Sequence, residues 1–282
     1  MDAPELVALL KGRRIAVLTG AGLSTDSGIP DYRGPDSPPA NPMTIRQFVT
    51  SREYRQRYWA RNHLGWRHMA SRQPNAGHRA LAELERAGVV TGLITQNVDM
   101  LHTKAGSTRV INLHGTYAQV VCLDCGHTCT RAALAERLES VNPGFTERAG
   151  KPGSMAVAPD ADATVTDTTS FVFVDCPACG GILKPDIVYF GESVAKAVVE
   201  QAFSLVDDSD ALLVAGSSLT VFSGYRFVRH AAANGTPVAI INRGPTRGDG
   251  LATVKVEAGC SAMLALLADE LITRPRVGER CS

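Results

Sequence analysis

The sequence predicts an α/β fold in which helices cover both faces of a parallel sheet, with a smaller metal-binding module added to it. Two observations carry this prediction. Several apolar runs that fit short buried strands each end in glycine or polar residues, as expected where the carboxyl ends of parallel strands form a ligand-binding edge. Two Cys-x-x-Cys pairs also stand far apart in the chain, a spacing typical of zinc ligands.

Bulk composition supports a folded protein with one large domain and a small module. The chain has 282 residues, of which 44% are hydrophobic and 20% charged, and its formal net charge is +1. This balance suggests neither nucleic acid nor membrane as a partner, and no apolar run approaches the length of a membrane span. The segment from Met1 to Lys11 lacks a basic start followed by a long apolar core. We therefore expect a cytoplasmic protein.

The stretch that follows the first apolar run, Ile15–Leu18, is expected to bind phosphate. It contains Gly20-Ala21-Gly22 and then the hydroxyl residues Ser24 and Thr25. Glycine permits a tight turn and close approach of a ligand, and a helix starting there directs free N–H groups and its positive end at an anion. The next glycine is Gly28, so the usual G-x-G-x-x-G spacing is not met and an ordinary strand-to-helix turn remains an alternative.

A polar loop follows this turn. Pro30 stops the helix, and the next three residues can close over a bound nucleotide: Asp31, Tyr32 and Arg33.

The second and third strand ends carry an amide pair and a histidine. Val89–Thr95 precedes Gln96-Asn97-Val98-Asp99, and Asn97 and Asp99 are suited to hold a carboxamide, although a polar strand-end turn is the simpler alternative. Val110–Leu113 precedes His114, which can accept a proton near neutral pH. The other histidines have no comparable context and are expected to be structural: His63, His68, His78, His102, His127 and His230.

Two later strands complete the expected sheet edge. Ala211–Ala215 ends in Gly216-Ser217-Ser218, whose hydroxyls suit a ribose, and Pro237–Ile241 ends in Asn242, Arg243 and Gly244. A last strand is predicted at Val254–Val256, and a helix capped by Cys260 is predicted to run to about Leu271.

The remaining pattern predicts helices and loops around the sheet. Helical spacing covers Pro4–Leu10 and Thr44–Ala70, the latter broken near Gly65. Asn75 is a good N-cap for a helix to Glu85. A further helix is expected at about 131–140, followed by a loop at 142–169, and the polar end at 273–282 is expected to be disordered.

Four of the seven cysteines form the metal-site prediction: Cys122, Cys125, Cys176 and Cys179. Each pair is followed by glycine, and a tight turn brings two thiolates onto one ion. Four thiolates fill a tetrahedral shell, so the zinc is structural and Cys129 is a spare thiol. A redox pair is the alternative considered for this spacing.

Taken together, these motifs resemble those of the sirtuins, the NAD-dependent protein deacylases, over about residues 14–271. Asp31-Tyr32 and the segment 55–66 resemble class II, the group that contains the mitochondrial sirtuin four. The resemblance implies a Rossmann-like large part at about 1–34, 74–116 and 183–272, a helical module at 43–72 and a zinc-ribbon module at 117–182. It implies NAD as cofactor and one structural zinc ion.

The resemblance also implies roles for individual residues. His114 would be the general base, with Asn97 as the second catalytic residue. The remaining contacts fall into two sets. NAD would be bound by Gly20, Ala21, Gly22, Ser24, Thr25, Pro30, Asp31, Tyr32, Arg33, Gln96, Asn97, Val98, Asp99, Gly216, Ser217, Ser218, Asn242, Arg243, Gly244 and Cys260. The substrate would be bound by Val188, Phe190, Gly191, Glu192 and Gly224.

The implied activity is transfer of an acyl group from a protein lysine to NAD, giving free lysine, nicotinamide and O-acyl-ADP-ribose. The partner would be an acyl-lysine peptide that pairs with the extended segment 181–192 as an added strand. Two alternatives stay open: a protein mono-ADP-ribosyltransferase using the same NAD site, and a non-catalytic NAD-sensing or nucleic-acid module. The near-neutral net charge argues against this non-catalytic module. Acidic acyl groups are not favoured, because the Tyr-Arg pair that reads them in the succinyl-specific branch is not found in the class II segment.

Overall fold

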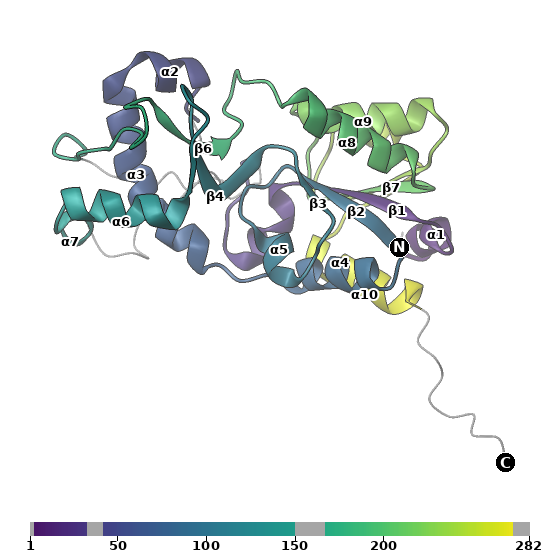
Figure 1. The fold of residues 1–282 in the computed structure, drawn as a ribbon. Helices are drawn as coiled ribbons and strands as arrows, with labels where there is room; N and C mark the ends of the chain where they lie inside the picture. The colour runs from purple at the N-terminus through teal and green to yellow at the C-terminus, as the bar shows by residue number, and fades with distance from the viewer. Residues whose placement is uncertain (1–2, 33–41, 150–166, 273–282) are drawn as a thin grey trace.

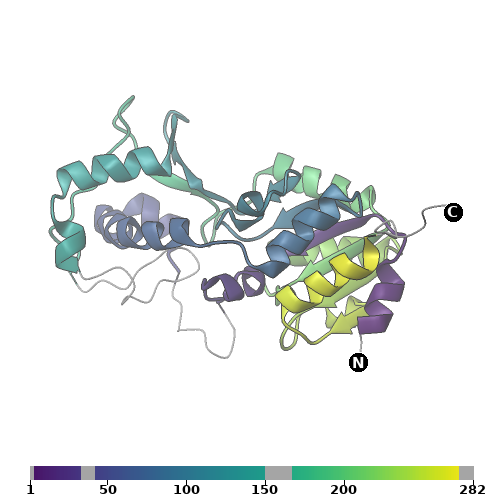
Figure 2. The same ribbon diagram turned by 90° about the horizontal axis from the view of Figure 1, so that it is seen from below.

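The protein has a larger and a smaller lobe (Figures 1 and 2). The computed structural model describes residues 3–32, 42–149 and 167–272. Three predictions concern residues outside this description: the NAD contact of Arg33, the part of the predicted loop at 150–166, and the disorder predicted for 273–282. Among the helices that are described, none has both the length and the apolarity needed to cross a lipid bilayer.

A six-stranded parallel sheet forms the larger lobe, with the strand order β3-β2-β1-β7-β8-β9. The chain turns from one half of the sheet to the other between the central neighbours β1 and β7, the topological switch point at which such sheets bind ligands. The predicted α/β class with a Rossmann-like sheet is confirmed. The strands are β1 (Ile15–Thr19), β2 (Val90–Thr95), β3 (Val110–Asn112), β7 (Ala211–Ala215), β8 (Val238–Ile241) and β9 (Val254–Val256).

Helices cover both faces of this sheet because its central strands are apolar on both sides. Ile15 and Val17 of β1 pack in one cluster with α1, α4 and α10, whereas Ala16 and Leu18 pack in another with α8 and α9. Figure 1 shows α4 and α10 below the sheet and α8 and α9 above it. The helices of this lobe are α1 (Ala3–Leu10), α4 (Ala76–Arg86), α5 (Leu101–Ala105), α8 (Lys196–Asp207), α9 (Phe222–Ala233) and α10 (Cys260–Leu271).

The smaller lobe combines helices with a three-stranded antiparallel sheet of order β5-β4-β6. Phe48, Tyr58 and Trp59 on the helices share one hydrophobic cluster with Val120 and Leu183 of the sheet. The predicted helical and zinc-binding segments therefore pack on each other, while their exact boundaries remain predictions. The elements are α2 (Ile45–Thr50), α3 (Arg52–Ser71), β4 (Gly115–Cys122), β5 (Thr128–Thr130), α6 (Arg131–Val141), α7 (Phe145–Ala149) and β6 (Leu183–Ile187).

Three local predictions were wrong. The turn after β1 leads into two short 3-10 helices, Ala21–Leu23 and Thr25–Ser27, because the chain turns into a left-handed conformation at Gly28 (φ 78°) before Pro30. The helix predicted at 44–70 breaks at Ser51 and not at Gly65. Ser51 is extended and its hydroxyl accepts a hydrogen bond from the Tyr54 N–H, so it caps α3, whereas Gly65 is buried within α3. The third is the loop predicted at 142–169, which contains α7.

The core of the smaller lobe can be tested on α3. Trp59 is 1% exposed and meets Phe48 and Tyr58 edge-on, whereas Tyr54 on the same helix is 40% exposed. We expect Trp59→Ala to lower the free energy of unfolding by about 3–5 kcal/mol, and Tyr54→Ala, as the control, by less than about 1 kcal/mol. Urea unfolding followed by circular dichroism measures both. Equal effects would contradict the assigned core.

Candidate functional site

A cleft of about 920 Å³ lies between the two lobes. Its size is at the upper end of the range of small-molecule sites, roughly 300–1,000 Å³. The ends of β1, β2, β3, β7 and β8 line one side, and the segment after β6 together with Met43 and Tyr58 lines the other. The strand ends that the sequence singled out thus meet in one place, as the parallel topology requires.

The base of the cleft is built from two glycine turns in backbone contact. The Gly22 N–H donates to the Gly216 carbonyl at 2.9 Å, and the Gly20 N–H donates to the Ala215 carbonyl at 3.1 Å. A Cβ on Gly20 would lie 2.7 Å from the Gly216 carbonyl oxygen. Gly216 itself has φ 67°, and a Cβ there would lie 2.3 Å from the Leu23 nitrogen. These glycines are needed for contact between the turns, in addition to any approach of a ligand.

Polar side chains from the end of β2 fix the first glycine turn. Asn97 Nδ2 donates to the Gly20 carbonyl at 2.9 Å and to Ser24 Oγ at 3.1 Å, and Ser24 Oγ donates to Asp99 Oδ2 at 2.6 Å. The Leu101 N–H donates to the other oxygen of Asp99 at 2.9 Å. Burial raises the pKa of Asp99, and the hydroxyl of Ser24 partly opposes this. The Ser24 hydroxyl proton is therefore engaged in the hydrogen bond to Asp99.

The second glycine turn is tied to β2 by Gln96. Its Nε2 donates to Ser217 Oγ at 2.8 Å. Asn242 shapes the neighbouring turn, where its Nδ2 donates to the carbonyls of Arg243 and Gly244 at 2.8 and 3.1 Å.

His114 lies at the start of the crossing from the larger to the smaller lobe. Its Nδ1 is 2.9 Å from the Gln96 carbonyl oxygen, and its Nε2 is 2.7 Å from Ser223 Oγ. A carbonyl only accepts, so Nδ1–H donates to it, and in the neutral ring Nε2 is the basic nitrogen, which accepts from the Ser223 hydroxyl. Burial lowers the pKa of His114; the Gln96 carbonyl raises it, and the positive charge of Arg226 lowers it further.

The segment after β6 connects both lobes to the cleft. The Val188 N–H donates to the His114 carbonyl at 2.9 Å, and the Ile45 N–H donates to the Phe190 carbonyl at 3.0 Å. Glu192 points back into the protein, because Lys184 Nζ lies 2.8 Å from both of its oxygens and the Tyr189 N–H donates to Oε2 at 2.9 Å. The carboxylate of Glu192 is thus engaged, and Phe190 remains 43% exposed.

Most predicted site residues line the cleft, including His114, Asn97 and the predicted substrate residues Val188, Phe190, Gly191 and Glu192. Four described residues do not: Thr25, Pro30, Gly224 and Cys260. A Cβ on Gly224 would lie 2.6 Å from Gln96 Oε1, so Gly224 allows α9 to approach the strand end. Cys260 is buried as the first residue of α10, and burial raises its pKa to about 12. Arg33 lies outside the described residues.

Several lining residues were not predicted from the sequence, among them Arg226 and Ser223, whose hydroxyl is 2.7 Å from His114 Nε2. Both belong to the first turns of α9, which follows the strand end at Gly216. The position of that helix directly after a ligand-binding strand end is the signal that could have found them. Met43, Tyr58 and Val194 also line the cleft, and no local pattern distinguishes them from core residues.

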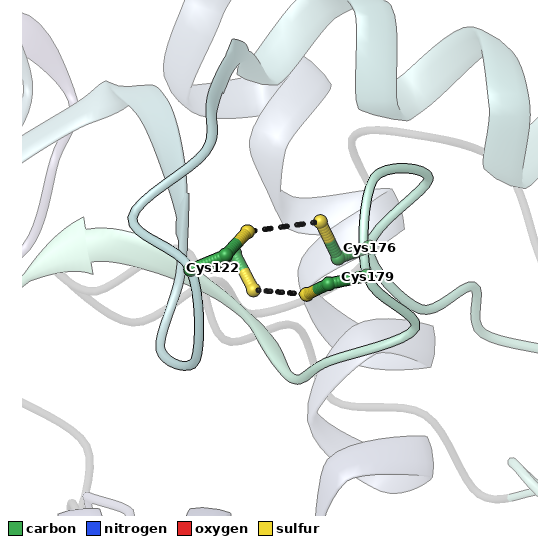
Figure 3. Close-up of side chains that lie close together, drawn as sticks. Cys122, Cys176 and Cys179 are labelled. Carbon is green, nitrogen blue, oxygen red and sulfur yellow. Dashed lines mark hydrogen bonds between the residues drawn. The ribbon is translucent and has the colours of Figure 1, made fainter.

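The four predicted zinc ligands converge at the far end of the small sheet. Figure 3 shows Cys122 facing Cys176 and Cys179 across the gap between two loops. Cys122 Sγ is 3.5 Å from Cys179 Sγ, and Cys125 Sγ is 3.8 Å from Cys176 Sγ; all four sulfurs lie within 4.8 Å of one another. A tetrahedral shell with Zn–S bonds of about 2.3 Å places sulfurs about 3.8 Å apart, so the cluster fits one structural zinc ion.

The fold and this cleft define a dinucleotide-binding α/β protein with a thiolate zinc centre. A profile described as "Sir2 family" matches residues 20–223, and the chain belongs to that family, the sirtuins. It is 73% identical over 274 residues to an NAD-dependent protein deacetylase 1 of Mycobacterium avium, covering 97% of each chain. It is 45% identical over 262 residues to the human "NAD-dependent protein lipoamidase sirtuin-4, mitochondrial", covering 90% of this chain and 82% of the relative.

A solved structure described as "Sir2-p53 peptide-NAD+" has the same fold, with a TM-score of 0.76 and 30% identity over 96% of this chain and 98% of that one. The relatives named sirtuin-4 confirm the resemblance to the sirtuin four group that was drawn from Asp31-Tyr32 and segment 55–66.

The contact between the glycine turns can be tested with a matched pair of substitutions. Gly235 has φ 74°, similar to Gly216, but a Cβ there would meet nothing within 4 Å. We expect Gly235→Ala to lower the free energy of unfolding by about 1–2 kcal/mol, from backbone strain alone. Gly216→Ala should lower it by about 1–3 kcal/mol more, from overpacking. Urea unfolding measures both variants. If Gly216→Ala lowers the free energy of unfolding no more than Gly235→Ala does, the two turns are not tightly packed.

The zinc centre can be tested with Cys176→Ser. We expect the purified variant to lose the zinc that wild type holds at one ion per chain, because three thiolates leave the tetrahedral shell open. Cys129→Ser is the control, since Cys129 is outside the four-sulfur cluster. Atomic emission of dialysed protein measures the metal. Zinc loss in Cys129→Ser, or full zinc in Cys176→Ser, would contradict the assignment.

Proposed function

We propose that this protein is an NAD-dependent protein-lysine deacylase that uses His114 as its general base. Acyl-lysine, NAD and one water would give lysine, nicotinamide and O-acyl-ADP-ribose. Family membership and the deacetylase names of its relatives support this activity. The observation that carries the proposal for this chain is His114: its Nδ1–H is fixed on the Gln96 carbonyl, so that Nε2 is the basic nitrogen at the wall of the cleft.

The residues of the cleft fit the cofactor that the family implies. The paired glycine turns at the switch point are the place where α/β sheets bind dinucleotides. We propose that Gly20–Gly22 and Ser217 with Ser218 hold the diphosphate and ribose parts. Asn242, Arg243 and Gly244 stand at the next strand end, where they would hold the adenine part. When bound, NAD supplies a nicotinamide leaving group and the ADP-ribose that accepts the acyl group.

Asn97 and Asp99 would hold the carboxamide end. In the structure both side chains are fixed by Ser24 and by backbone groups of the loop, so they are pre-oriented before a ligand arrives. His114 would accept a proton at Nε2 from a hydroxyl of the bound nucleotide. Its lowered pKa keeps the ring neutral, and therefore basic, near pH 7.

The acyl-lysine substrate would enter from the side of the segment after β6. This segment lines the cleft and joins both lobes before it turns at Gly191. We propose that it pairs with the peptide through its main chain, which demands little of the peptide sequence. Phe190 and Val188 would contact the acyl-lysine side chain. Glu192 would act indirectly, because its carboxylate is bonded to Lys184 and to the Tyr189 N–H.

Mono-ADP-ribosyl transfer from the same NAD site is not favoured, because the relatives carry deacetylase, deacylase and lipoamidase names. A cytoplasmic location is part of the proposal, supported by the zinc-thiolate cluster, which suits a reducing compartment.

The activity can be tested by measuring nicotinamide release from NAD with acyl-lysine peptides from acetyl to lipoyl. We expect release that depends on the peptide, and a fall of at least ~10²-fold in His114→Ala. His127→Ala is the control, because His127 is exposed in the connection between β4 and β5, outside the cleft.

Three results would contradict the proposal. They are nicotinamide release without peptide, a similar loss of nicotinamide release in His114→Ala and His127→Ala, and ADP-ribose covalently attached to the peptide in place of the deacylated product. The peptide that reacts fastest would identify the acyl class.

A further inference from the structure

The first turns of α9 carry two residues that line the cleft together with the proposed base. Ser223 is the second residue of this helix and Arg226 follows one turn later. Ser223 is buried, and its hydroxyl is 2.7 Å from His114 Nε2. Both residues line the cleft.

Arg226 has no ion-pair partner in the described part of the chain. Its Nε is buried and has no hydrogen-bond partner there, and its guanidinium lies over the Phe222 ring at 5.2 Å. Its charge is therefore not neutralised next to His114.

The other charged groups around His114 are engaged or exposed. On the loop after β2, Asp99 is bonded to Ser24 and to the Leu101 N–H. On the segment after β6, Glu192 is bonded to Lys184. Asp186 of β6 touches Gly115 through its backbone, and its side chain is exposed. Arg226 is thus the charge that bears on the imidazole from the elements packed around it.

We propose that Ser223 and Arg226 are positioning residues that hold His114 in its neutral form, with Nε2 as the accepting nitrogen. In the neutral ring the Ser223 hydroxyl donates to Nε2 and so orients this nitrogen; since a hydroxyl can also accept from a protonated ring, Ser223 fixes the position of Nε2 and not its charge. Arg226 and the positive end of α9 both disfavour a positive charge on the imidazole. One helix thus sets both the position and the charge of the imidazole. This inference deepens the proposed function, because it concerns how the same base is kept ready.

The test is the titration of His114 in the ligand-free protein by nitrogen-15 NMR of the imidazole ring. In wild type we expect a midpoint below about 6.5. In Ser223→Ala the Nε2 signal should move to that of an unbonded nitrogen, because the hydrogen bond to the neutral ring is lost. Ser223→Thr keeps the hydroxyl and should retain the wild-type Nε2 signal.

Arg226→Gln should raise the midpoint, whereas Arg226→Lys should keep it low. The control is Arg229→Gln, an exposed arginine on the same helix, which should leave the midpoint unchanged. An unchanged midpoint in Arg226→Gln, or an unchanged Nε2 signal in Ser223→Ala, would overturn the inference. So would a protonated Nε2 in neutral wild type. Because no NAD or peptide is present, these outcomes are independent of whether deacylation occurs.

A second readout is the acid limb of kcat/KM. In Arg226→Gln it should move upward by the same amount as the NMR midpoint. A loss of rate with an unmoved limb in this variant would show that Arg226 acts only on the structure of α9, and would also overturn the inference.

Discussion

The contact between the turns after β1 and β7 is the constraint on which the rest of the cleft depends. The Gly22 N–H and the Gly216 carbonyl join the two halves of the parallel sheet at the switch point. There is no room for a side chain at this contact. Asn97 and Gln96 then attach the end of β2 to the same two turns. Three strand ends are therefore fixed relative to one another before any ligand arrives, which is what a site for an extended dinucleotide requires.

Within this frame, the charged and hydroxyl groups of the cleft divide into those used by the protein and those left for chemistry. The side chains of Ser24, Asp99 and Glu192 form hydrogen bonds with other groups of the protein. His114 has one nitrogen committed to the Gln96 carbonyl, and the other meets only a hydroxyl. In the neutral ring, Nε2 is therefore the nitrogen able to gain a proton, as the proposed deacylase chemistry needs.

The sequence predicted the sheet and most of the cleft because these depend on short-range signals. Apolar runs of about five residues fit strands that are buried on both faces, and the carboxyl ends of parallel strands must meet at one edge. The zinc ligands were predictable because each Cys-x-x-Cys pair is local. Ser223 was missed because its partner is 109 positions away in the chain, and helix spacing alone cannot show which neighbour a first-turn hydroxyl faces. The position of the break in the helices of the smaller lobe was misread at Gly65, since a buried glycine can sit within a helix when packing requires it.

One hydrophobic cluster spans the cleft and limits how its walls can move. It contains Tyr58 and Tyr189 from the side of the smaller lobe, and Ile29 and Val98 from the loops after β1 and β2 also pack in it. In the described residues, the backbone crosses between the lobes at His114–Gly115 and at the segment 187–192, among other places. Rotation at these crossings would separate side chains of the shared cluster, so their packing resists a wider cleft. Because His114 stands at one of these crossings, the direction of its Nε2 depends on the same packing that sets the width of the cleft.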